Sequence, residues 1–215
     1  MKTIVILLFL TSCLFANCQR KNLGGGTSNE KYDEFKQNFP HLLIDQLPPT
    51  LEHHVRSLIS KINYEKNDII LVLCQDGLSK NEIDIIKNRF LNNVEEKYNY
   101  LDSCIFKINM FESIETNASR EIAVIEDTNQ INRSCYLTRL PVPNFIEYSD
   151  QSEDTDFRID FSYEIWVIDA KRGKKFNEFN LGPNPQMPKE WKNGYSKGIA
   201  FSETEGVILY WSAIW

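Results

Sequence analysis

The spacing of apolar residues changes about half-way along the chain. Up to about residue 100 it mostly follows the helical period, whereas after Leu101 short apolar runs are separated by polar or proline-bearing loops. This change predicts that helices dominate the first half of the chain and strands the second half.

Two stretches predict the main helices. Residues 50–62, "TLEHHVRSLISKI", follow two prolines, offer Thr50 as an N-cap and repeat apolar residues along one helical face. Residues 79–101 begin with a capping box, "SKNE", and continue with an apolar stripe. A weaker helix is expected over residues 29–39, where aromatic residues recur along one edge.

Strands are predicted where the apolar runs are short. Residues 69–74 are apolar on both faces and precede an Asp-Gly turn signal, which indicates a strand buried on both sides. The last strand, residues 207–214, is also apolar on both faces, and the short link "SETEG" joins it in a hairpin to residues 198–201. The other candidate strands are residues 104–111, 122–125, 135–140 and 157–169.

Helices followed by strands indicate an α+β fold. We predict a mainly antiparallel sheet of about six or seven strands, with the two main N-terminal helices packed on it. The length of 215 residues and the apolar fraction of 42% suit one globular domain, which we place at residues 31–215.

The first 18 residues are typical of an export signal. One lysine precedes an apolar run that is too short to cross a bilayer, and the sequence turns polar at Gln19. The segment resembles the signals of bacterial lipoproteins, in which small residues precede a cysteine that is diacylated and begins the mature chain. "FANC" gives Cys18 this role, "LTSC" offers Cys13 as the alternative, and ordinary cleavage after Cys18 is a third possibility.

The resemblance concerns residues 1–18 alone, and it implies where in the cell the protein is located. We expect an exported, lipid-anchored protein of the bacterial cell envelope, in the outer membrane and facing the periplasm. Residues 19–30, "QRKNLGGGTSNE", have the composition of a flexible tether between such an anchor and the domain.

Charge narrows the choice of partner. The formal net charge is -6, and an acidic surface repels phosphate backbones, so no nucleic-acid partner is expected. The one dense basic run, "KRGKK" at residues 171–175, has glycine at its centre and is typical of a solvated hairpin turn. The predicted partners are the membrane, through the lipid anchor, and an envelope or exported protein.

The sequence carries no recognised catalytic motif: serine-hydrolase, zinc-protease, nucleotide-binding and Cys-x-x-Cys patterns are all missing from it. His53 and His54 are adjacent, and on a helix they would point about 100° apart, which does not suit one metal ion. We therefore predict no catalytic residue, no metal and no cofactor.

A possible polar binding face lies on the alternating strand at residues 157–169, and it comprises Arg158, Asp160, Ser162 and Glu164. Asp160 and Glu164 lie about 13 Å apart along one strand. Paired carboxylates of glycosidases are about 5 to 9.5 Å apart, so an acidic active site would need a further acid from a neighbouring strand.

Three cysteines belong to the predicted domain. Cys104 and Cys135, both near predicted strand starts, are the possible disulfide pair, and Cys74, inside the most apolar strand, is the expected buried thiol.

An export signal, a tether and a domain without catalytic machinery favour a non-catalytic binding domain of an envelope lipoprotein, such as an immunity-type inhibitor or an assembly accessory. The alternative is an exported hydrolase that uses carboxylates.

Overall fold

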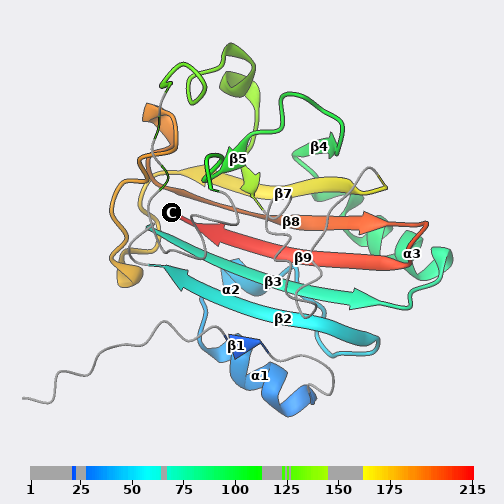
Figure 1. Cartoon of the computed structure of the whole chain (residues 1–215). Coiled ribbons are helices and arrows are strands. Elements are labelled where there is room, and N and C mark those ends of the chain that lie inside the picture. Colours follow the sequence, from blue (N-terminus) through cyan, green and yellow to red (C-terminus); the bar gives the residue numbers. More distant parts are fainter. Residues whose placement is uncertain are drawn as a thin grey trace, which may run out of the picture.

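The computed structural model describes residues 21–22, 28–63, 67–112, 123, 125, 127–144 and 162–215. Within these ranges the α+β class is confirmed, with a large antiparallel sheet, a two-stranded parallel sheet and three α-helices (Figure 1). The predicted signal, with Cys13 and Cys18, lies outside the described residues. Among the helices that are described, none has the length and apolar character needed to cross a membrane.

The main sheet has the strand order β1-β2-β3-β9-β8-β7-β4, so β9 occupies its centre (Figure 1). Every residue of β8 and β9 is buried, which confirms that the last strand is covered on both faces. The strands are β1 (Lys21–Asn22), β2 (His54–Asn63), β3 (Asp68–Asp76), β4 (Glu96–Asn99), β7 (Glu164–Arg172), β8 (Gly194–Ser202) and β9 (Val207–Ile214).

The α-helices α1 (Asn29–Gln37), α2 (His41–Ile44) and α3 (Lys80–Phe90) pack on one face of the sheet, and α2 and α3 are seen behind it in Figure 1. The other face is covered by loops, by the short pair β5 (Lys107–Ile108) and β6 (Val142–Pro143), and by the 3₁₀ helix η2 (Ser134–Thr138). The sheet therefore separates two hydrophobic clusters. Whereas α1 and α2 precede the long strands, α3 lies between β3 and β4, so the helices are not all N-terminal.

Polar contacts dock α2 against the sheet. The Lys197 side chain is buried in the middle of β8, and its Nζ donates to the Leu42 carbonyl at 2.8 Å and to Asp45 at 2.5 Å. Gln46 Nε2 donates to Ser212 Oγ at 2.6 Å. Because a buried ammonium is costly without partners, these contacts fix where the short helix sits.

The N-terminal end of α3 follows the prediction, whereas its C-terminal end does not. Ser79 and Glu82 form the reciprocal capping box that "SKNE" indicates. The helix ends at Phe90 rather than at Leu101, because a 3₁₀ turn over Leu91–Asn93 with two poor helix formers follows, and the chain then extends as β4.

The predicted helix at residues 50–62 is wrong, since this segment forms strand β2. A β-bulge between Val55 and Ser57 inserts one extra residue into the pairing with β3. Val55 and Leu58, three residues apart, consequently face the same side, and Ile59 faces the other. A bulged strand buried on both faces thus imitates helical spacing.

The remaining strand predictions have mixed outcomes. The β8–β9 hairpin is confirmed, and β3 matches the predicted buried strand. Residues 135–140 are wrong as a strand, because they lie largely in η2, and residues 104–111 contribute only the two residues of β5. Residues 157–161 lie outside the described residues, and of residues 122–125 only two are described, neither in a strand.

Two short segments differ from their expected role. Lys21 and Asn22, inside the predicted tether, pair with β2 as β1. The basic run at residues 171–175 is exposed, and Gly173 has a φ of 93° as a turn requires. It does not close a tight hairpin, however, because β8 begins only at Gly194.

Candidate functional site

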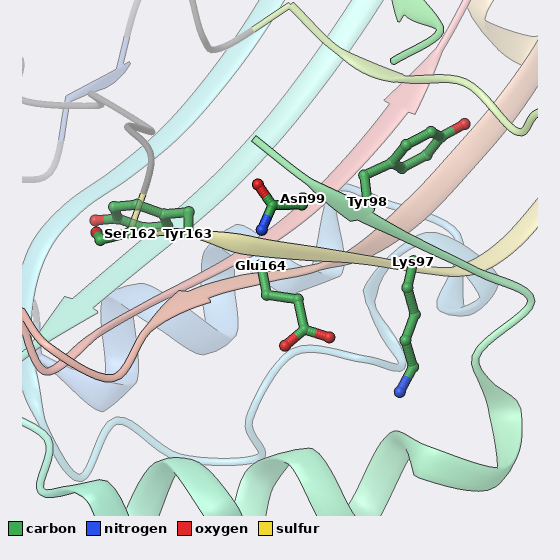
Figure 2. A pocket seen from close by; sticks show the side chains of 6 residues that line it. All are labelled: Lys97, Tyr98, Asn99, Ser162, Tyr163 and Glu164. Atoms are coloured by element: carbon green, nitrogen blue, oxygen red, sulfur yellow. The ribbon is translucent and has the colours of Figure 1, made fainter. Parts of the chain in front are cut away.

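A hollow of about 380 Å³ opens at one edge of the main sheet, where β4 pairs with β7 (Figure 2). We call it the edge hollow, because β4 is the last strand in the sheet order. Three consecutive residues of β4, the first residue of β7 and the two residues before it line the hollow: Lys97, Tyr98, Asn99, Ser162, Tyr163 and Glu164.

The strand register decides which lining side chains share a face. Lys97 lies opposite Trp166, and Asn99 lies opposite Glu164. Cross-strand partners point to the same face of a sheet, here the face that carries the helices. Figure 2 shows the side chains of Lys97 and Glu164 extending to the same side, whereas Tyr98 points to the other.

The indole of Trp166 positions both charged groups. Its Nε1 donates to Glu164 Oε1 at 2.5 Å, and Lys97 Nζ lies 4.0 Å from the centre of its ring. Trp166 is itself 2% exposed and packs edge-on against Phe201, with ring centres 5.2 Å apart. A buried ring therefore holds a cation and a carboxylate in place beside the edge hollow.

Two buried tyrosines close the hollow on the opposite face. The Tyr98 hydroxyl donates to the Leu140 carbonyl at 2.6 Å, and the Tyr163 hydroxyl donates to Glu205 at 3.3 Å. Burial raises the pKa of both phenols well above the usual tyrosine value, and the nearby carboxylates of Glu96 and Glu205 raise it further. Both hydroxyls therefore stay protonated and structural.

Ser162 connects the edge hollow to the β8–β9 turn. Its hydroxyl lies 2.7 Å from that of Ser202 and donates to Glu205 at 3.2 Å. The backbone N–H of Glu205 in turn donates to Ser202 Oγ at 3.2 Å. This set of contacts fixes the start of β7 against a turn distant in sequence.

The lining residues are suited to recognition. The described lining contains one carboxylate, Glu164, whereas hydrolysis by paired carboxylates needs two within about 5 to 9.5 Å. Across the described ranges, no three His, Cys, Asp or Glu side chains are grouped so that they could hold a metal ion. An ammonium, a carboxylate, an amide and a hydroxyl offer donors and acceptors to a bound partner.

No protein-family model, curated protein or solved structure matches this chain. The edge hollow is therefore interpreted from its own chemistry.

Two of the six residues that line the hollow were predicted from the sequence. Ser162 and Glu164 of the predicted polar face line the hollow, and Arg158 and Asp160 lie outside the described residues. Lys97 and Asn99 were not predicted, because the apolar stripe of the preceding helix continues through them in the sequence. The signal that could have found them is "EKYN", a short alternating run after two asparagines.

A disulfide braces the chain beyond β4. Cys104 and Cys135, the pair expected from the sequence, are bonded in the structure with their Cα atoms 6.1 Å apart, and Cys74 is a buried free thiol. Arg139 bridges Glu96 and Asp102, with both N–O distances at 2.7 Å. These links tie the segment after β4 to η2.

Leu101 is the most exposed large apolar residue among those described, at 75%. It follows the edge hollow by two residues, and its backbone N–H donates to Asn99 Oδ1 at 3.0 Å. An amide that lines the hollow thus also holds this leucine in a turn on the surface.

The histidines lie on different elements than expected. His54 begins strand β2, and its Nδ1 is 2.7 Å from Asp76 Oδ1 at the end of β3. Arg56, at the bulge, donates through Nε to Asp76 Oδ2 at 2.9 Å. Burial alone would raise the pKa of Asp76, but these two hydrogen bonds outweigh it and lower the pKa. The cluster fastens the open end of the β2–β3 hairpin.

A buried polar network that the sequence did not reveal lies at the start of β3. Asn109 donates to Asp68 at 2.5 Å and accepts from Asn184 Nδ2 at 2.6 Å, and Gln186 Nε2 donates to Glu112 at 2.8 Å. All five are at most 2% exposed. Since buried amides need partners, the network holds two distant loops against the sheet.

Proposed function

We propose that this chain is a cell-envelope lipoprotein whose domain binds an exported or envelope protein, with the edge hollow as the docking point. The observation that carries the proposal is that Trp166 holds Lys97 and Glu164 at the edge hollow, two residues before an exposed leucine in the chain, Leu101.

Preorganisation supports this reading. Binding is weakened when flexible side chains must be ordered, and Trp166 already orders the carboxylate and the ammonium. The pair is also asymmetric, because it presents one donor group and one acceptor group to a partner. Such a pair gives orientation and specificity rather than most of the affinity.

Leu101 would supply the apolar contact. Protein interfaces usually combine an apolar centre with a polar rim, and a few residues carry most of the binding energy. The turn held by Asn99 and the nearby disulfide keep this leucine in place, so little order would be lost on binding.

The test is affinity capture from detergent-solubilised membranes with three forms of the full chain: wild type, Lys97→Glu and Leu101→Gln. We expect the wild type to retain a specific protein and each variant to retain at least about tenfold less of it, since losing a central contact costs about 2 kcal/mol or more and about 1.4 kcal/mol is already tenfold in affinity. Quantitative mass spectrometry of the captured proteins gives the ratio.

Ile85→Gln is the matched control, because Ile85 is also a large apolar residue, 61% exposed, on α3. It should capture as much as the wild type. Capture that is equal in all four forms would contradict docking at the edge hollow, even if a protein is retained.

The lipid anchor has its own test. Mass spectrometry of the N-terminal peptide from the native host is expected to show a mature chain that begins at a diacylated Cys18. Cys18→Ser should abolish the acyl mass and shift the protein from the membrane to the soluble fraction. A free Gln19 N-terminus, or acylation at Cys13, would contradict this assignment.

A further inference from the structure

A second hollow, of about 140 Å³, lies at the opposite end of β7 from the edge hollow, near the point marked C in Figure 1. We call it the basic hollow. The loop after β7, the start of β8 and the end of β9 form it, and it is lined by Gly173, Lys174, Lys175, Phe176, Asn177, Asn180, Leu181, Asn193, Gly194, Ile214 and Trp215.

Two lysines that line this hollow, and an arginine that precedes them in the chain but does not line it, lack an acidic partner in the described ranges. Arg172, Lys174 and Lys175 make no ion pair within 4.0 Å with any acid in the described ranges. Their neighbour Lys171, in contrast, is paired with Asp169 at 3.2 Å and with Glu95 at 3.4 Å. In a chain with a net charge of -6, this is an uncompensated positive region.

Aromatic rings, rather than carboxylates, hold two of the cations. The guanidinium of Arg172 lies 5.0 Å from the centre of the Trp191 ring, and Lys175 Nζ lies 5.3 Å from that of Tyr195. Cation–π contacts leave the N–H donors available, because the ring accepts no conventional hydrogen bond from each of them. The aromatic rings therefore hold the positive charges of Arg172 and Lys175 in position without neutralising them.

The backbone around the hollow is already set. Gly173 N–H donates to the Asn193 carbonyl at 2.8 Å, and Gly194 N–H donates to the Trp215 carbonyl at 2.9 Å. Asn180 adopts a left-handed conformation, with φ of 48°, that turns the loop back. The hollow is thus lined mainly by the loop after β7, which these hydrogen bonds hold against the ends of β8 and β9.

We propose that the basic hollow binds a phosphate group. A volume of about 140 Å³ corresponds to four or five water molecules at about 30 Å³ each, which suits one compact anion. Inorganic phosphate or a phosphate monoester carries close to two negative charges, and a phosphodiester headgroup carries one. Both present several acceptor oxygens, which the ammonium groups of Lys174 and Lys175 match. The phosphate can belong to a soluble phosphoryl compound or to a lipid headgroup, and the experiment separates these sources.

The soluble arm is isothermal titration of the full chain with sodium phosphate at low ionic strength, with sodium acetate as the singly charged comparison. The test variant is Lys174→Gln/Lys175→Gln, and we expect it to bind phosphate at least about tenfold more weakly than wild type. The matched control is Lys31→Gln/Arg89→Gln, which removes the same charge at two exposed positions on α1 and α3 and should bind as wild type does.

The lipid arm is sedimentation with vesicles of phosphatidylcholine, with or without phosphatidylglycerol. A lipid anchor would bind both kinds of vesicle. The readout is therefore the difference in the vesicle-bound fraction between the test variant and the control variant. A loss restricted to phosphatidylglycerol vesicles assigns the phosphate to a headgroup, and a loss in the soluble arm alone assigns it to a soluble ligand.

Three results would overturn the proposal. The first is that the test variant binds phosphate as the wild type does and binds vesicles as the control variant does. The second is that acetate binds as tightly as phosphate. The third is that neither phosphate nor vesicles bind. Circular dichroism of the test variant should match that of the wild type, because both lysines are exposed.

Discussion

Deletion of residues 207–215 is expected to leave a chain with no cooperative unfolding transition. These residues include β9, which pairs with β3 on one side and with β8 on the other, so its loss divides the sheet. The side chains of β9 also reach both cores. Leu209 and Trp211 belong to the cluster under the loops, and Ile208 and Tyr210 to the cluster under the helices.

The size of the expected loss of folding free energy follows from the burial of the β9 side chains. Each large side chain contributes about 1.5–3 kcal/mol when it is fully buried, and β9 holds six such residues, all at most 5% exposed. The total reaches the stability of a typical domain, about 5–15 kcal/mol. The six are Val207, Ile208, Leu209, Tyr210, Trp211 and Ile214.

Thermal and urea unfolding followed by circular dichroism measure this effect. The surface variant Leu101→Gln serves as the control and should melt as the wild type does. A truncated chain that stays monomeric and melts cooperatively would contradict the central role of β9.

The elements that could be predicted from the sequence are those whose signals are local. A continuous apolar run identifies β3 and β9, since a strand covered on both faces needs no alternation. The start of α3 could be predicted because both partners of its capping box lie within four residues.

The elements that were missed depend on partners elsewhere in the chain. The bulge in β2 exists only in its pairing with β3, and without it residues 50–62 match a helix. The end of α3 is likewise set by the pairing of β4 with β7, which are separated by more than sixty residues. Tertiary pairing overrides local propensity in both cases.

The same limit applies to the functional sites. Alternation in the sequence indicated Ser162 and Glu164, but Lys97 and Asn99 reach the same hollow only through the pairing of β4 with β7. The basic run was visible in the sequence as a turn. That Lys171 pairs with acids while Arg172, Lys174 and Lys175 do not, within the described ranges, is a property of the folded chain.

Gly198→Ala is expected to cost about 3 kcal/mol or more of folding free energy, because β8 has no room for a methyl group at this point. A Cβ at residue 198 would lie 2.1 Å from the carbonyl oxygen of Trp166 and 2.6 Å from Cζ2 of Trp211. The carbonyl belongs to the neighbouring strand β7, so a side-chain rotation cannot relieve the first clash. The Trp211 ring is fully buried between the sheet and the loops, so it has little space to move.

Urea unfolding at equilibrium measures the loss, and Gly173→Ala is the matched control. A Cβ at residue 173 would meet no atom within 4 Å, and its φ of 93° leaves only the cost of a left-handed backbone, about 1–2 kcal/mol. The double variant Gly198→Ala/Trp211→Phe then separates the two clashes. Since the carbonyl clash persists when the indole is trimmed, the double variant should remain less stable than Trp211→Phe alone. Equal stability of these two variants, or a Gly198→Ala chain as stable as Gly173→Ala, would show that β7 and β8 can separate at this point without disrupting the sheet.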